Sequence, residues 1–213
     1  MSKEKFEQKE AVSEKQNRWN ELEAEVDQIG DKLGMGVDRR IKPVVRGLMA
    51  NGFQTTMSCE GHVNRDDHGY PWPWVTIESP LSAEVKKNRR FDFLDNTASL
   101  KDGWNNMSEK DRKEWQKFKD VINEADGKED KRLKKILDEF YKDEKGNRPE
   151  RIGVDSGHVW PKEMLELWSR IKGKIIDVHK TWPKEEKKKK LELYQQEFKR
   201  FAEFLKERFF REK

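Results

Sequence analysis

Apolar residues recur every three or four positions through much of the chain, the spacing that places side chains on one face of an α-helix. This pattern predicts helices over about 12–29, 39–51, 161–178 and 184–213. The last helix repeats large apolar residues at a/d-type spacing, namely Leu191, Tyr194, Phe198, Phe201 and Leu205. Such a stripe needs apolar cover. The cover is either the rest of this domain or a second copy, so we expect a monomer or a dimer formed through this helix.

Three shorter segments have the composition of β-strands. Residues 53–59 (FQTTMSC) are rich in β-forming side chains, and 73–79 alternates apolar with more polar positions. Residues 151–156 place Ile152 and Val154 on one face. The sequence therefore predicts a small sheet of about three strands.

The first predicted strand also indicates how its cysteine is placed. In a regular strand Phe53, Met57 and Cys59 share one face, because side chains alternate. Phe53 and Met57 mark that face as core. Cys59 is therefore expected to point towards apolar surroundings.

A helical hairpin over 107–145 is predicted between the second and third strands. Ser108 and Asp111 have the spacing of a helix-start signal, and apolar residues at helical spacing follow. The polar segment 125–130 (ADGKED) interrupts them and is predicted to form the turn. The expected fold class is α+β, a helix-rich single domain over 1–213 with a small sheet and this inserted hairpin.

Composition favours a folded and highly charged protein. Hydrophobic residues make up only 33%, but eight Trp and eleven Phe allow few side chains to bury a large area. The 46 basic residues nearly balance the 42 acidic ones, and residues 184–213, with 11 basic and 7 acidic, account for the net charge of +4. A nucleic-acid-binding protein ordinarily has a more one-sided basic patch, so a nucleic-acid partner has weak support.

The chain has one cysteine, so it forms no intramolecular disulfide. No apolar stretch approaches the roughly 20 residues that a membrane helix needs. The N-terminus has no hydrophobic signal region. We therefore expect a soluble, cytoplasmic protein that does not bind a membrane.

Residues 55–74 (TTMSCEGHVNRDDHGYPWPW) gather most of the candidate chemistry. Cys59 and His62 lie three positions apart in a turn, where an imidazolium would lower the pKa of the thiol and yield a nucleophilic thiolate. Glu60 is the candidate to orient the imidazole, which makes Cys59, His62 and Glu60 the catalytic candidates. The competing interpretation is a small buried cysteine, and both stay open at this stage.

A metal site is the second interpretation of this segment. Its ligands would be Cys59, His62 and His68, with Asp66 or Asp67 as a further oxygen donor. No second Cys or His pair at metal-binding spacing accompanies them, and Cys59 is expected on the apolar face. The sequence thus predicts no bound metal, and it identifies no cofactor.

The third interpretation is a pocket for a small polar molecule, such as a nucleotide. Hydroxyl and carboxylate groups would hydrogen bond to it, and an indole ring would supply a flat apolar surface for stacking. The candidates for ligand contact are Asp38, Thr56, Ser58, Trp72 and Asp155.

The segment 31–77 resembles a family of uncharacterised bacterial proteins. The resemblance lies in DKLGMGVD (31–38), in a helix followed by Gly-Phe and a threonine, in SCEGH (58–62) and in PWV (73–75). It implies an intracellular prokaryotic protein with a site at SCEGH, and it implies no particular chemistry.

A more distant similarity is to the methyltransferase family of wybutosine synthesis in tRNA. That family has a threonine pair followed by Ser-Cys-Ser-Gly-Arg after a helix, and residues 55–59 match its threonine pair and Ser-Cys. Glu60 and His62 stand where the family has Ser and Arg. These departures affect residues for substrate and methyl-donor binding, and the similarity is kept only as an alternative.

Together these patterns favour a domain that binds a small polar ligand or nucleotide, with or without catalysis, at the turn 58–62. The alternative is a non-enzymatic interaction protein that uses charged amphipathic helices, above all 184–213, to contact a protein or nucleic-acid partner.

Overall fold

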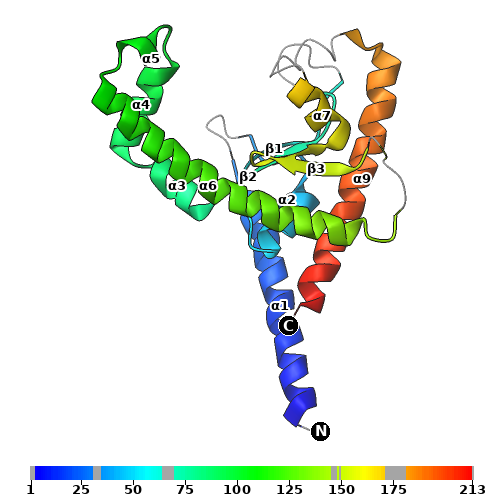
Figure 1. The fold of residues 1–213 in the computed structure, drawn as a ribbon. Helices are drawn as coiled ribbons and strands as arrows, with labels where there is room; N and C mark the ends of the chain where they lie inside the picture. Colours follow the sequence, from blue (N-terminus) through cyan, green and yellow to red (C-terminus); the bar gives the residue numbers. More distant parts are fainter. Residues whose placement is uncertain are drawn as a thin grey trace.

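The computed structural model describes residues 3–30, 35–63, 70–144, 148, 150–170 and 181–212, with only the backbone described for 3–11 and 167–170. In chain order the elements are α1 (Lys3–Gln28), α2 (Lys42–Ala50), β1 (Gln54–Cys59), β2 (Trp74–Glu78), α3 (Pro80–Lys86), α4 (Arg89–Ser99), α5 (Gly103–Asn106), α6 (Glu109–Phe140), β3 (Ile152–Asp155), β4 (His158–Pro161), α7 (Lys162–Arg170) and α9 (Lys184–Arg211). Helices thus surround one small antiparallel sheet (Figure 1), which confirms the α+β class.

The sheet has the order β1-β2-β4-β3, and each neighbouring pair is antiparallel. One of its faces packs against α2, α6 and α9, while α7 lies on the opposite side (Figure 1). The main core joins apolar side chains of these helices and strands, including Val44, Leu48, Val75, Ile77, Leu133, Ile136, Phe198 and Leu205. A second cluster on the α7 side contains Trp72, Trp160, Met164 and Tyr194.

The structure has one strand more than the sequence analysis predicted. β3 and β4 form a hairpin whose two turn residues, Ser156 and Gly157, have φ values of +50° and +77°. A two-residue turn with both φ values positive matches the right-handed twist of the strands that it joins. Ser-Gly between two apolar runs was therefore a hairpin signal, and the expected three strands are corrected to four.

A β-bulge in β1 overturns the expected alternation of its side chains. Thr55 pairs with Ile77 but Met57 pairs with Thr76, so Thr56 is an extra residue. Beyond the bulge Ser58 faces the core side together with its partner Val75, which is fully buried. The prediction that Met57 lies in the core is wrong, because its side chain is 59% exposed. Cys59, on the same face as Met57, is partly buried.

The insertion between β2 and β3 is helical, but the turn predicted at 125–130 does not form. The chain continues through it as the single helix α6, and Ala125 and Asp130 are buried there. Alanine, glutamate and lysine favour a helix, and one glycine in a helix costs only about 1 kcal/mol. In place of a second hairpin helix, α3 and α4 pack against α6 as an arm that leads away from the sheet (Figure 1), and the end of α6 packs against the sheet.

The apolar stripe of α9 is buried within the chain. All five predicted stripe residues are buried, and α9 packs closely against α2. This approach needs Gly47 in α2, because a Cβ atom there would lie 2.9 Å from Cβ of Leu205. The packing also brings the first half of α9 alongside the end of β1, where the candidate site lies.

Candidate functional site

The turn after β1 is held in a shape that only glycine tolerates at its centre. Gly61 has a φ of +85°. A Cβ atom at Gly61 would lie 2.6 Å from Cδ1 of Leu191 and 2.7 Å from the backbone carbon of Trp72. The His62 N–H donates to the Tyr70 carbonyl over 2.9 Å. These contacts fix where the side chains of Cys59 and His62 point.

A second segment, just before α2, is fastened to this turn by a reciprocal pair of hydrogen bonds. The Glu60 N–H donates to Oδ2 of Asp38 over 3.1 Å, and the Arg40 N–H donates to Oε2 of Glu60 over 2.9 Å. From α9, Nε2 of Gln195 donates to the Glu60 carbonyl over 2.8 Å. Three distant parts of the chain therefore meet at Glu60.

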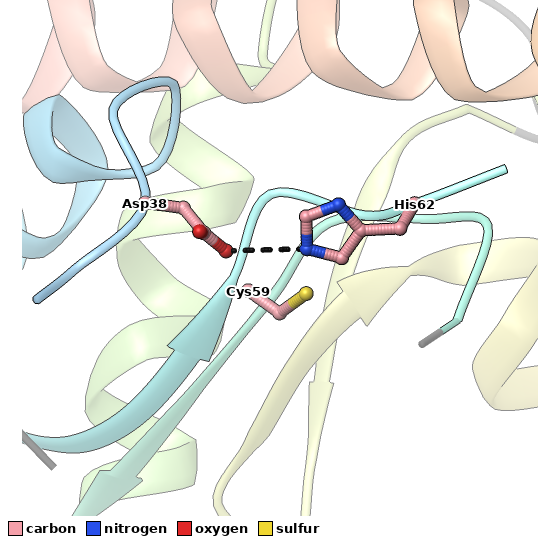
Figure 2. Close-up of side chains that lie close together, drawn as sticks. All are labelled: Asp38, Cys59 and His62. Carbon is pink, nitrogen blue, oxygen red and sulfur yellow. Dashed lines mark ion pairs between the residues drawn. The ribbon is translucent and has the colours of Figure 1, made fainter. Parts of the chain in front are cut away.

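Asp38, Cys59 and His62 converge at this junction (Figure 2). One potential ligand atom from each of the three residues lies within 4.8 Å of the other two. Oδ2 of Asp38 is 3.6 Å from Nε2 of His62, and the two side chains are 33% and 23% exposed. The group is thus partly buried but open to a solute.

Glu60 does not occupy the place that the sequence analysis expected for it. Its carboxylate accepts a hydrogen bond from the backbone of Arg40, and the carboxylate that faces the imidazole belongs to Asp38. Asp38 had been expected only as a ligand contact. Glu60 therefore holds the two segments together.

The surroundings of Cys59 favour the protonated thiol. Burial is the main cause that raises its pKa to about 11, and the negative charges of Asp38 and Glu60 add to it. The Gly61 N–H donates to Sγ over 3.4 Å and acts in the opposite direction. A thiol with this pKa supplies little thiolate at neutral pH, which weighs against a free cysteine nucleophile.

Trp72 lies behind the site and inside the second cluster. It is fully buried, and its ring stacks on Tyr70 with centroids 4.7 Å apart. It also packs at a tilt against Trp160, at 6.2 Å. The backbone of Trp72 supports Gly61, while its ring faces are covered by other side chains.

The remaining candidates for ligand contact lie apart from this group. Thr56 is exposed at the bulge, and Ser58 is partly buried on the core face of β1. Asp155 ends β3, at the sheet edge opposite β1, so three strand spacings, or about 14 Å, separate the two strands. Asp155 instead pairs in register with His158.

Some residues of the site gave no signal in the sequence. Gln195 reaches Glu60 only because α9 packs along α2, and no local pattern indicates such a contact. Of the alternative metal ligands, His68, Asp66 and Asp67 lie outside the described residues.

Comparisons with known protein families, with curated proteins and with solved structures found no match to this chain. Among the described residues no helix is both long and apolar enough to span a membrane. The functional inference therefore depends on the chemistry of the site.

Proposed function

We propose that this protein binds a small polar ligand at the end of β1, with Asp38 and His62 as the groups that contact it. The observation that carries this proposal is the convergence of a carboxylate, an imidazole and a thiol from two chain segments. Partly exposed polar groups that are held in place by hydrogen bonds are typical of small-molecule sites.

One basic side chain near the group, Arg40, favours a ligand with an anionic part. Arg40 is exposed, and its guanidinium hydrogen bonds to the side chain of Gln195, which also donates to the Glu60 carbonyl. An arginine at the rim pairs well with carboxylate or phosphate groups, and nucleotides belong to this class. If the site is catalytic, His62 is the group suited to proton transfer, since an imidazole ring carries both a donor and an acceptor nitrogen.

The alternative, an interaction protein acting through residues 184–213, has less support. The apolar stripe of α9 is buried against the chain's own α2, which leaves mainly charged and polar side chains of this helix for a partner, with Leu193 as an exposed apolar residue. Exposed ion pairs contribute little to binding energy. A contact through α9 would therefore be weak and sensitive to salt.

Thermal unfolding with a panel of nucleotides, sugar phosphates and small carboxylates tests the proposed function. A true ligand at 100 times its Kd should stabilise the protein by about 2.7 kcal/mol. The stabilisation should be lost in Asp38→Asn and His62→Ala and kept in Asp155→Asn, which makes the same change at the opposite sheet edge. Stabilisation by no member of the panel, or stabilisation that persists in both site variants, would contradict the proposal.

A further inference from the structure

The Asp38, Cys59 and His62 group differs from an ordinary ion pair in its spacing. The 3.6 Å between Oδ2 of Asp38 and Nε2 of His62 is too long for a good hydrogen bond. A tetrahedral metal ion with bonds of about 2.1 Å holds its ligand atoms about 3.4 Å apart. The ligand atoms of Asp38 and His62 are therefore spaced nearly as they would be around a metal ion, and the sulfur of Cys59 lies within 4.8 Å of both.

We propose that Asp38, Cys59 and His62 bind one zinc-type divalent metal ion through a carboxylate oxygen, a sulfur and an imidazole nitrogen. This inference rests on the site of the proposed function and gives it a cofactor. It departs from the expectation of no metal, which considered Cys59 and His62 with His68 and did not include Asp38. Among the described residues this is the only group of three Cys, His, Asp or Glu side chains that converges in this way.

The identity of the ligand atoms selects the class of metal. Calcium and magnesium take oxygen ligands, whereas one sulfur, one nitrogen and one oxygen suit zinc and neighbouring transition metals. Three protein ligands with the fourth position open are typical of catalytic zinc sites, and structural sites have four. The open position is where a water molecule or the anionic part of the ligand would bind.

Hydrogen bonds hold the three candidate ligands in place, as they do in most metal sites. Oδ2 of Asp38 accepts from the Glu60 N–H, which fixes the direction of the carboxylate. The Gly61 N–H donates to Sγ of Cys59 and partly offsets the burial that favours the protonated thiol; a bound metal ion would displace that proton. His62 is held through its backbone by Tyr70. Ligand atoms placed in advance lose little freedom when a metal ion binds.

The test uses the full chain, purified without a metal-affinity tag or chelator. Elemental analysis should find close to one equivalent of zinc or a neighbouring metal. Chelator-treated protein is then given one equivalent of Co²⁺, and thiolate-to-cobalt charge-transfer absorption is recorded. Cys59 is the only cysteine, so this absorption in the wild-type protein would identify Cys59 as a ligand without any variant.

Variants then test the other two ligands. Asp38→Asn and His62→Gln should each weaken cobalt and zinc binding at least tenfold, and Cys59→Ser should abolish the charge-transfer absorption. His158→Gln and Asp155→Asn are controls with similar changes elsewhere on the sheet, and both should bind like the wild type. Circular dichroism checks that each variant is folded. If the wild-type protein gives no charge-transfer absorption, or if folded Asp38→Asn and His62→Gln bind metal unchanged, the inference is overturned.

The same panel of ligands, repeated after chelation, separates this inference from the proposed function. If a ligand still stabilises the protein after chelation, this stabilisation needs Asp38 and His62, and no cobalt absorption is seen, the metal site is refuted but the proposed function is not. Cobalt absorption without stabilisation by any ligand would refute the proposed function alone.

Discussion

Oδ2 of Asp38 faces Nε2 of His62 at 3.6 Å, although α2 and β1 separate the two residues in the chain. The contact exists because Glu60, between Cys59 and His62, exchanges hydrogen bonds with the segment that starts α2. The geometry of the site therefore depends on how α2 packs against the sheet. Its chemistry can be tested through the thiol and its geometry through the turn.

The thiol of Cys59 should react slowly with an alkylating reagent in the folded, chelator-treated protein. Burial and the nearby carboxylates raise its pKa from 9.0 to about 11, so at neutral pH the thiolate fraction is about 100-fold below that of an ordinary cysteine. The rate should rise with pH up to about 11 in the native protein. In denaturant the rate should stop rising at a pH near 9.0, the ordinary pKa of a cysteine thiol.

Asp38→Asn tests how much the nearby carboxylate contributes to the raised pKa of Cys59. Removal of the Asp38 charge should move the rate profile of Cys59 to lower pH, but only part of the way, because burial is the larger cause of the shift. Asp155→Asn, across the sheet, should leave the profile unchanged. A native thiol that reacts as fast at neutral pH as the denatured one would contradict the described surroundings and restore the nucleophile interpretation.

Gly61→Ala should destabilise the protein by about 2 to 4 kcal/mol. The methyl group would overlap Leu191 and the backbone of Trp72, and an alanine at a φ of +85° adds backbone strain. Gly36→Ala is the control, since a Cβ atom there meets only the Ile29 carbonyl at 3.7 Å. Chemical denaturation should show a large loss for the first variant and less than about 1 kcal/mol for the second. Equal effects would mean that the turn is not tightly packed.

Local periodicity predicted most of the fold. The predicted strands at 53–59, 73–79 and 151–156 correspond to β1, β2 and β3, and the helix predicted over 39–51 contains α2. α2, β2 and β3 were predictable because the side chains on one face of each are buried together, whereas β1 was predictable from its β-forming composition. β4 was missed because the sequence analysis ended the last strand at 156 and began a helix at 161, although the Ser-Gly turn before β4 was a usable signal.

The candidate site was predictable only in its local part. Cys59 and His62 are close in sequence, so their neighbourhood in space follows from one turn. The approach of Asp38 depends on how α2 packs, and the bulge at Thr56 decides which face Cys59 takes. Neither the approach of Asp38 nor the bulge follows from the spacing of residues along the chain. Regular alternation of side chains along 53–59 therefore predicted wrongly that Met57 lies in the core.

Phe198→Ala in α9 should cost about 3 to 5 kcal/mol of unfolding free energy. Phe198 is 1% exposed in the main core, and truncation of a buried aromatic residue leaves a cavity. Leu193 lies on the same helix but is 43% exposed, so Leu193→Ala is the matched control and should cost less than about 1 kcal/mol. A loss below about 1 kcal/mol for Phe198→Ala would mean that α9 packs loosely and would favour the partner-binding alternative.

Gly127→Ala tests whether α6 is continuous, because Gly127 lies inside the segment that the sequence predicted to be a turn. A Cβ atom at Gly127 meets no other heavy atom within 4 Å, and alanine favours a helix over glycine by about 1 kcal/mol. The substitution should therefore stabilise the protein by about 0.5 to 1 kcal/mol in chemical denaturation. Gly127→Pro should destabilise it by about 3 kcal/mol or more, because proline removes a helical hydrogen bond and clashes with the preceding turn. If the segment were a turn, proline would be tolerated and alanine would bring no gain, so the opposite signs of the two changes distinguish one helix from two.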